Sequence, residues 1–371
     1  MTKPTIIKIT LCLFISLAFI SNDLLAQNIT TPRAPSPAAK VSQTVGLSKV
    51  TIKYSRPAAK GREIWGTQLA HYGYVNLGFG PATAAPWRAG ANENTTITFS
   101  DDATVEGKTI PAGTYGFFIG IHEDGSADMI FSKNSTSWGS YFYSQDEDQL
   151  RVKVTTKEIA NTERLTFDFI EITDKSATIV LDWEKKRFPF KVEFDVHKIV
   201  LANARNELRS VTGFGWQGYM SAARYCVQND INHEEALVWI DKAIANNNNF
   251  NTVFVKAQLV EQMDKDSGAQ YDEAAQQANN AQLNFMAYAM MGKGKHEKAL
   301  EYFKLNTERN PDDPNTFDSL GECYKTMGEN KLAIKAFKKS LSMNPPQRVK
   351  DNSIKLLKEL GVDTSKYEAA G

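Results

Sequence analysis

The sequence predicts an α+β multidomain protein, in which an antiparallel β-sandwich or barrel-like N-terminal domain precedes an all-α helical solenoid. Between about residues 41 and 197, apolar and polar residues alternate in short segments, which is the period of a β-strand. From Trp216 onward the apolar residues follow a helical period, and part of the pattern recurs after 34 residues. The 371 residues are enough for two domains of ordinary size.

The β domain is predicted from segments of strict alternation separated by turn sequences. These segments are residues 50–54, 95–99, 114–121, 150–154, 165–172, 177–183 and 188–196. Glu106-Gly107-Lys108, Asp124-Gly125 and Asp174-Lys175 supply turn residues between them. Because no helical period lies between the segments, the strands are expected to pair antiparallel.

The helical half contains a spaced set of small, aromatic and proline residues. Seven residues resemble the tetratricopeptide pattern: Phe317, Leu320, Gly321, Tyr324, Ala333, Phe337 and Pro345. Ala299, Phe303 and Pro311 repeat the last three of these positions 34 residues earlier. In such a repeat the small residues let two helices approach, the aromatic residues fill the space between them, and proline ends the unit.

Upstream of these two repeats the match is looser. Residues 220–227 and 236–243 are expected to form one helix pair, and residues 254–278 fit another only if an insertion around 264–268 is allowed. At the C-terminal end, apolar residues at 354, 357 and 360 precede Gly361, which suits a capping helix. The exact number of repeats before residue 283 stays open.

Several stretches of the β half together resemble a family. They are SRPAAKGREIWG (55–66), WRAGANENTTITFS (87–100), IPAGTYGFF (110–118), WGSYFY (138–143) and LDWEKKRFPF (181–190). Over residues 38–196 the chain resembles an uncharacterised secreted bacterial family, domain of unknown function 2911. The resemblance implies an exported protein and brings no reaction or ligand. Residues 75–86 form a longer stretch than expected between two of these motifs.

The N-terminus has the layout of a secretory signal. Lys3 and Lys8 precede an apolar run at residues 9–20, and Ala26 offers a small residue for cleavage. The expected organisation is therefore a signal peptide (1–26), a Pro/Ser/Thr-rich leader (27–40), the β domain (41–197), a linker helix (198–215), the repeats with their cap (216–361) and a tail (362–371). After signal removal, no segment is apolar for long enough to span a membrane.

Composition and motifs exclude several classes of function. The 43 basic and 43 acidic residues balance, so no overall positive field favours nucleic acid. Spacings typical of metal ligands, dinucleotide loops and catalytic nucleophiles are missing, so neither a metal nor a cofactor is expected. Cys226 and Cys323 are expected to be buried packing thiols. A pair of carboxylates among Glu93, Asp101, Glu123 and Asp168 stays open as a hydrolytic site.

Arginine, lysine and aromatic residues gather near the expected strand ends and form the candidate ligand site. The candidates are Arg56, Lys60, Arg62, Trp87, Arg88, Asn92, Glu93, Trp138 and Tyr141. Arginine forks beside aromatic faces suit a carbohydrate or a small anionic ligand. The alternative is structural, with Gly90-Ala91-Asn92 as a tight turn and Arg88 paired with Glu93 across it.

The leading interpretation is an exported, non-enzymatic binding or scaffold protein whose helical groove takes a peptide or partner protein. The alternative is an envelope carbohydrate- or small-ligand-binding protein or hydrolase that uses the arginine and aromatic cluster of the β domain. A deep hollow joining Arg56, Arg88 and Glu93 would favour the alternative, whereas a fully paired convex patch would favour the scaffold.

The signal sequence generates a first prediction. Because cleavage is expected after Ala26, the mature protein should begin at or near Gln27 in the periplasm or outside the cell. N-terminal sequencing of the purified native protein checks this. An intact Met1 in a cytosolic fraction would contradict it.

Overall fold

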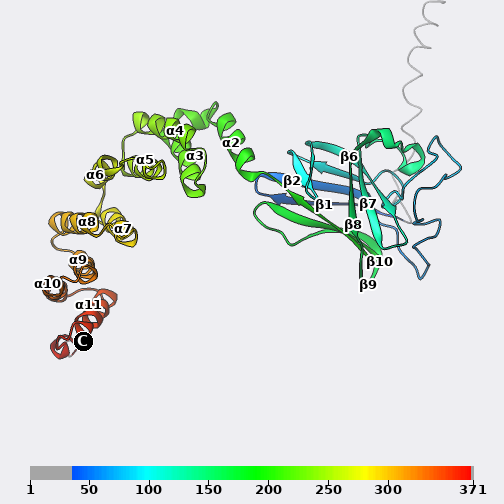
Figure 1. Cartoon of the computed structure of the whole chain (residues 1–371). Helices are drawn as coiled ribbons and strands as arrows, with labels where there is room; N and C mark the ends of the chain where they lie inside the picture. Colours follow the sequence, from blue (N-terminus) through cyan, green and yellow to red (C-terminus); the bar gives the residue numbers. More distant parts are fainter. Residues whose placement is uncertain (1–35, 369–371) are drawn as a thin grey trace, which may run out of the picture. The chain divides into compact units, whose positions relative to one another are not determined.

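A computed structural model describes residues 36–368, and its contacts divide the chain into two units, Met1–Val200 and Leu201–Gly371. The first unit contains the strands and the second contains most of the helices (Figure 1). The division falls inside helix α2 (Val196–Glu207). The expected signal peptide, residues 27–35 of the expected leader and residues 369–371 of the tail lie outside the described residues.

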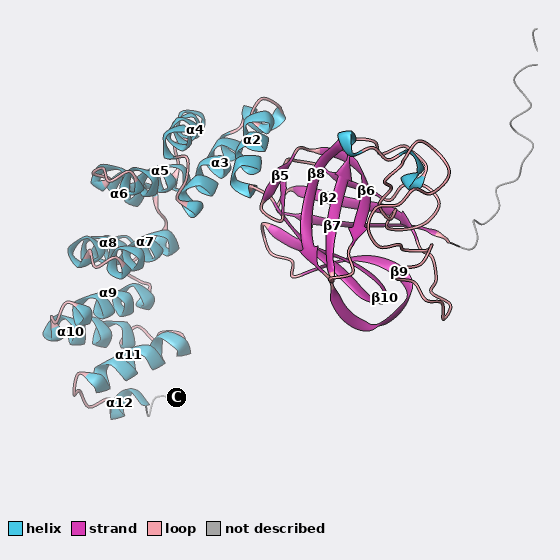
Figure 2. Ribbon diagram, turned by 45° about the vertical axis from the view of Figure 1, so that its right-hand side comes forward, coloured by secondary structure: helices cyan, strands magenta, loops and turns pink. Residues whose placement is uncertain are grey.

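The β domain is a sandwich of two antiparallel sheets (Figure 2). The six-stranded sheet runs in the order β1 (Ala38–Val45), β2 (Ser48–Ser55), β3 (Thr96–Phe99), β6 (Gly113–Ile121), β7 (Ser126–Ser132) and β8 (Asp148–Thr155). The four-stranded sheet runs in the order β5 (Lys108–Ile110), β4 (Ala103–Val105), β10 (Ser176–Glu193) and β9 (Lys157–Ile170). One core is shared by both sheets: Phe117 and Phe131 from the first pack with Phe167 and Phe190 from the second.

The sandwich confirms the predicted fold class, but individual strands differ from the expected segments. Strand β1 begins at Ala38, inside the stretch for which an extended leader was expected. Strand β7 was not foreseen. Residues 176–193 form one strand instead of two, because the chain passes through the charged stretch around Glu184 by irregularities in the β9–β10 pairing and not by a turn. At this bend Glu184 has a φ of 53°, a left-handed backbone conformation that is unfavourable for residues other than glycine.

The outer side of the six-stranded sheet carries a second, smaller core. Phe118 of β6 and Ile130 of β7 point away from the sandwich core and pack with Ala82, Ala85 and Tyr143. Ala82 and Ala85 belong to the long segment between β2 and β3, which also joins β6 through the bridge between Trp87 and Ile119. This segment and residues 133–147 therefore cover part of the outer face of the sheet.

The helical domain is a series of antiparallel helix pairs, which Figure 1 shows from α3 in green to α11 in red. The pairs are α3 (Trp216–Asn229) with α4 (His233–Asn246), α5 (Phe250–Gln262) with α6 (Gly268–Gln277), α7 (Asn280–Gly292) with α8 (His296–Arg309), and α9 (Pro314–Thr326) with α10 (Asn330–Leu341). Helix α11 (Gln347–Glu359) and the short α12 (Ser365–Glu368) follow, and the short 3₁₀ helix η3 (Val211–Phe214) lies between α2 and α3.

The helix pairs are packed as the repeat pattern requires. Ala299 and Ala333 are fully buried, as are Phe303 and Phe337. A Cβ atom on Gly321 would lie 2.6 Å from the ring of Phe337, so α9 and α10 approach as closely as they do because residue 321 has no side chain. Pro311 and Pro345 lie between one helix pair and the next element.

This packing predicts the effect of enlarging Ala333. Replacing Ala333 with Trp would force a large ring into a fully buried position and destabilise the helical domain by about 1–3 kcal/mol or more. Because the two units have separate cores, the β domain should keep its own melting transition. Calorimetry of the wild type and the variant measures this. If both units melted in one transition and the substitution shifted that transition, the two-unit account would be contradicted.

A charged cluster links α5 to α6 and to the connection between α7 and α8. The carboxylate of Glu261 accepts hydrogen bonds from Lys293 (2.5 Å), Lys295 (2.7 Å) and the hydroxyl of Tyr271 (2.7 Å). Burial alone would raise the pKa of Glu261, but these three donors outweigh it and lower the pKa to about 2. The ionised carboxylate thus stabilises the contact between successive helix pairs.

The lowered pKa of Glu261 predicts a pH dependence. The stabilisation should be fully present above pH about 4.5, the ordinary pKa of the group, and should disappear as the pH falls toward about 2. Glu261→Gln should therefore lower the melting temperature at neutral pH, and the gap to the wild type should close over that range. Glu308→Gln, on the exposed side of α8, is the control; a gap that did not change with pH would contradict the assignment.

Candidate functional site

Two arginines of the predicted ligand site bind the protein's own backbone. Arg56 donates to the carbonyl of Leu165 (3.0 Å) and to the hydroxyl of Thr166 (2.5 Å) on β9. Arg62 donates to the carbonyls of Ala59 (3.0 Å) and Ala58 (2.6 Å). Both guanidinium groups therefore hold the segment after β2 in place, and less of their hydrogen-bonding capacity is left for a ligand.

Trp87 belongs to the core of the sandwich. It is 3% exposed and stacks on Trp183, with ring centroids 6.0 Å apart and planes 6° apart. Trp65 meets both rings edge to face. Trp87 consequently offers no exposed face on which a sugar ring could stack.

Arg88 and Asn92 are joined in a turn. Arg88 donates to the carbonyl of Asn92 (3.2 Å), and the amide of Asn92 donates to the carbonyl of Ser36 (3.2 Å) and the hydroxyl of Ser55 (3.3 Å). Asn92 has a φ of 63°, a left-handed conformation that asparagine tolerates. A Cβ atom on Gly139 would lie 2.5 Å from Cζ of Arg88, so the guanidinium packs directly on that glycine.

The remaining candidates lie nearer the surface. Tyr141 stacks under the guanidinium of Arg88 at 4.8 Å and meets the exposed ring of Phe79 edge to face. Trp138 is 48% exposed. Lys60 and Glu93 are exposed, and the backbone amide of Lys60 donates to Glu163 (3.0 Å). The structure therefore brings Arg88 and Tyr141 into contact, whereas Arg56 and Arg62 bind backbone carbonyls elsewhere in the β domain.

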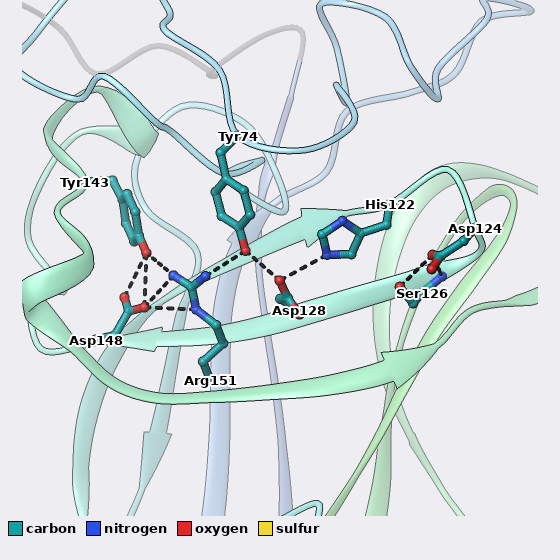
Figure 3. A network of polar contacts seen from close by, with 8 residues as sticks. All are labelled: Tyr74, His122, Asp124, Ser126, Asp128, Tyr143, Asp148 and Arg151. Carbon is teal, nitrogen blue, oxygen red and sulfur yellow. Dashed lines mark hydrogen bonds and ion pairs between the residues drawn. The ribbon is translucent and has the colours of Figure 1, made fainter.

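A polar network that the sequence did not indicate lies beside the small outer core (Figure 3). Arg151 of β8 donates to Asp148 (2.7 Å), to the hydroxyl of Tyr143 (2.7 Å) and to the hydroxyl of Tyr74 (2.9 Å). Tyr74 in turn donates to Asp128 (2.7 Å), which also contacts Nε2 of His122 at 3.0 Å. These residues come from four separate stretches of chain, so no local motif marks them.

The network is built to hold its surrounding segments together. Burial raises the pKa values of Tyr74 and Tyr143, so both hydroxyls stay protonated and donate their hydrogen bonds. A side chain at position 120 would collide with the hydroxyl of Tyr74, so Gly120 lets the ring lie against β6. Because each charged group in the network already has a partner, this arrangement fixes the segment around Tyr74 onto β7 and β8.

The helical domain contains a groove of about 460 Å³ that is lined by α7 and α9, the first helices of two consecutive pairs, and by α11, which follows the last pair. Asn284, Asp318 and Asn352 occupy equivalent places in these helices, because each is 34 residues from the next. Tyr288, Asn315 and Glu322 line the same groove, and Arg348 and Lys355 lie on its α11 side. The 34-residue spacing therefore arranges polar side chains in a row along one surface.

The floor of this groove is acidic. Asp318 is only 4% exposed; its carboxylate accepts a bond from Asn352 (2.8 Å) and one from the hydroxyl of Ser353. The amide of Asn352 also donates to Glu322 (2.6 Å), so one amide bridges two carboxylates. Burial raises the pKa of Asp318. Within residues 36–368, the ion pairs of the helical domain use other carboxylates, such as Glu261 and Glu359.

Reactive groups are scarce in the described part of the chain. Among residues 36–368, no group of three or more histidine, cysteine or acidic side chains is arranged to hold a metal ion. Cys226 and Cys323 are buried free thiols, and burial raises the pKa of Cys323 to about 11. The helices of the same part are also too short or too polar to cross a membrane.

Family models match both halves of the chain. Residues 36–192 match the family described as "Protein of unknown function (DUF2911)", and residues 315–347 match a tetratricopeptide repeat. The β domain is similar to this family over nearly all of its length. The helical domain contains tetratricopeptide repeats, so both resemblances noted in the sequence are confirmed. No curated protein matches the chain.

Solved structures similar to the chain are tetratricopeptide-type proteins of low identity. YrrB, described as a TPR protein with an unusual peptide-binding site, is 17% identical over 40% of this chain and 79% of its own, with a TM-score of 0.28. PilF of Pseudomonas aeruginosa is 20% identical over 40% and 71%, with a TM-score of 0.29. MamA of Desulfovibrio magneticus RS-1 is 12% identical over 42% and 89%, with a TM-score of 0.30.

The turn that contains Arg88 and Asn92 generates a stability prediction. Arg88→Ala should cost about 1.5–3 kcal/mol, because it removes a charged hydrogen bond and the packing on Gly139. Asn92→Ala should cost about 1–2 kcal/mol, because alanine is unfavourable in the left-handed conformation. Thermal melts without any ligand measure both.

The exposed Lys133→Ala is the control, with an expected change within about 0.5 kcal/mol. If Arg88→Ala and Asn92→Ala melted like this control, the turn would not depend on these side chains, and their role as ligand contacts would be favoured instead.

Proposed function

We propose that this chain is an exported, non-enzymatic binding protein, and that its helical groove holds an extended peptide or a segment of a partner protein. The observation that carries the proposal is the acidic groove of α7, α9 and α11. Tetratricopeptide repeats stack into surfaces of this kind, which bind other chains and carry out no reaction by themselves. Export is supported by the basic and apolar pattern of residues 1–26.

The groove favours a ligand that donates hydrogen bonds. Asp318 and Glu322 are acceptors, and within the described residues the buried Oδ1 of Asn284 has no hydrogen-bond donor. A buried acceptor without a donor costs free energy, and so does a buried carboxylate without a cation. A peptide backbone supplies amide donors, and a lysine or arginine side chain supplies the cation.

The charge distribution of the groove favours one orientation of a bound peptide. Asp318 and Glu322, which share the amide of Asn352, lie on α9, whereas α11 contributes the two basic residues Arg348 and Lys355 and one acidic residue, Asp351. A peptide cation is expected to lie over Asp318 and Glu322, and an acidic side chain or a backbone carbonyl is expected to lie toward Arg348 and Lys355. Such a ligand satisfies both ends of the groove at once.

The alternative function, a carbohydrate site or hydrolase at the arginine and aromatic cluster, has less support. Trp87 is buried, and Arg56 and Arg62 bind backbone carbonyls. The geometry around Arg88 fits a structural turn.

Selection from a random peptide library on the chain from Gln27 onward tests the proposal. Enriched peptides should carry lysine or arginine. Glu322→Gln should weaken the binding of a selected peptide by roughly 1.5–3 kcal/mol, the worth of a hydrogen bond between charged groups, which is about tenfold or more in Kd.

Glu308→Gln, an exposed position on α8, is the matched control and should bind like the wild type. A library without enriched peptides would contradict the proposal, as would peptides that bind Glu322→Gln as tightly as the control variant.

A further inference from the structure

The outer face of the six-stranded sheet presents two lysines side by side. Lys40 of β1 and Lys53 of β2 are direct cross-strand partners, and Lys53 is also paired with Thr96 of β3. Both lysines are exposed. Like charges that face each other across two strands repel and destabilise the pair. Within residues 36–368, neither Lys40 nor Lys53 forms an ion pair with an acidic side chain.

A loop turns this face of the sheet into a groove. Residues 134–137 lie against β6 at Gly116, where any side chain would collide with the carbonyl of Asn134. The side-chain oxygen of Asn134 accepts a hydrogen bond from the backbone amide of Ser137 (3.2 Å). The side-chain amide of Asn94 donates a hydrogen bond to the hydroxyl of Ser137 (2.9 Å). The loop is therefore fixed from both sides and forms a wall above the strands.

The groove has a volume of about 770 Å³ and is lined by both apolar and polar groups. Its floor carries Lys40, Lys53, Thr96 and Thr114, and its wall carries the hydroxyl groups of residues 135–137. Glu93 also lines it and already has an interaction of its own. Hydroxyl and ammonium groups around one hollow are the kinds of partner that hydroxyl-rich, negatively charged ligands use.

Asn94 adds an acceptor that lacks a donor. Its side chain is only 7% exposed and lines the groove, and its Oδ1 has no hydrogen-bond partner among the described residues. The amide nitrogen of Asn94 is occupied by Ser137. A ligand hydroxyl that donates to this oxygen would remove the cost of leaving a buried acceptor unsatisfied.

We propose that this groove binds an acidic sugar. Its carboxylate binds the ammonium groups of Lys40 and Lys53, which are directly paired residues of β1 and β2, and one of its hydroxyls donates to Oδ1 of Asn94. An inorganic anion would satisfy the lysines but would leave the acceptor at Asn94 open and the groove largely unfilled. A neutral sugar would leave the lysines unpaired. The proposal concerns the β domain and does not rest on the helical groove.

Titration calorimetry of the chain from Gln27 onward tests it with trigalacturonate as the acidic probe and maltotriose as a neutral probe of the same length. Trigalacturonate should bind, and Lys40→Ala and Lys53→Ala should each weaken it about tenfold or more. Added salt should weaken it further, because exposed charges are screened. Maltotriose should bind at least tenfold more weakly to the wild type.

Lys49→Ala is the matched control, because Lys49 lies on the same face of β2 and does not line the groove. It should bind trigalacturonate like the wild type, and all three variants should melt no lower than the wild type, because the removed lysines are exposed. The proposal is overturned if trigalacturonate does not bind at millimolar concentration, if the three variants bind it equally, or if maltotriose binds as tightly.

Discussion

The close approach of paired helices is the constraint on which the helical domain depends. Gly321 brings the backbone of α9 against the ring of Phe337, and the buried Ala299 and Ala333 serve the same purpose in α8 and α10. Because these small residues recur with the repeat, α7, α9 and α11 present equivalent positions to one surface. Asn284, Asp318 and Asn352 therefore form a row. The groove follows from the packing, and its acidic character follows from which residues occupy that row.

The β domain depends in the same way on how one face of the six-stranded sheet is covered. The long segment between β2 and β3 has few strand pairings of its own, and it is fixed by the small core around Phe118 and by the hydrogen bonds of Arg151, Tyr74 and Asp128. Farther along the same sheet, toward β1, the described residues of the outer face form the groove that contains Lys40 and Lys53. One part of this face is thus covered by polar and apolar packing, and the described residues of the other part line a groove.

The sequence predicted the elements whose cause is local. Alternation located β2, β3, β6 and β8, and the 34-residue spacing located α7 to α10. It failed where the cause lies far along the chain. Strand β10 continues through Glu184 because β9 pairs along it, and the charged residues there look like a turn. Trp87 looked like a ligand contact, but Trp183, almost a hundred residues later, buries it. The network around Arg151 joins residues between 74 and 151 and has no local signature. Lys40 and Lys53 become neighbours only through the pairing of β1 with β2.

The central claim is that the row formed by α7, α9 and α11 is the surface that receives a peptide. Hydrogen–deuterium exchange of the full chain, compared with and without a lysine-containing peptide selected for binding, tests this most directly. The account predicts slower exchange in α7, α9 and α11, with α8, α10 and the strands of the β domain unchanged. Protection confined to α8 and α10, or to the β domain, would contradict it.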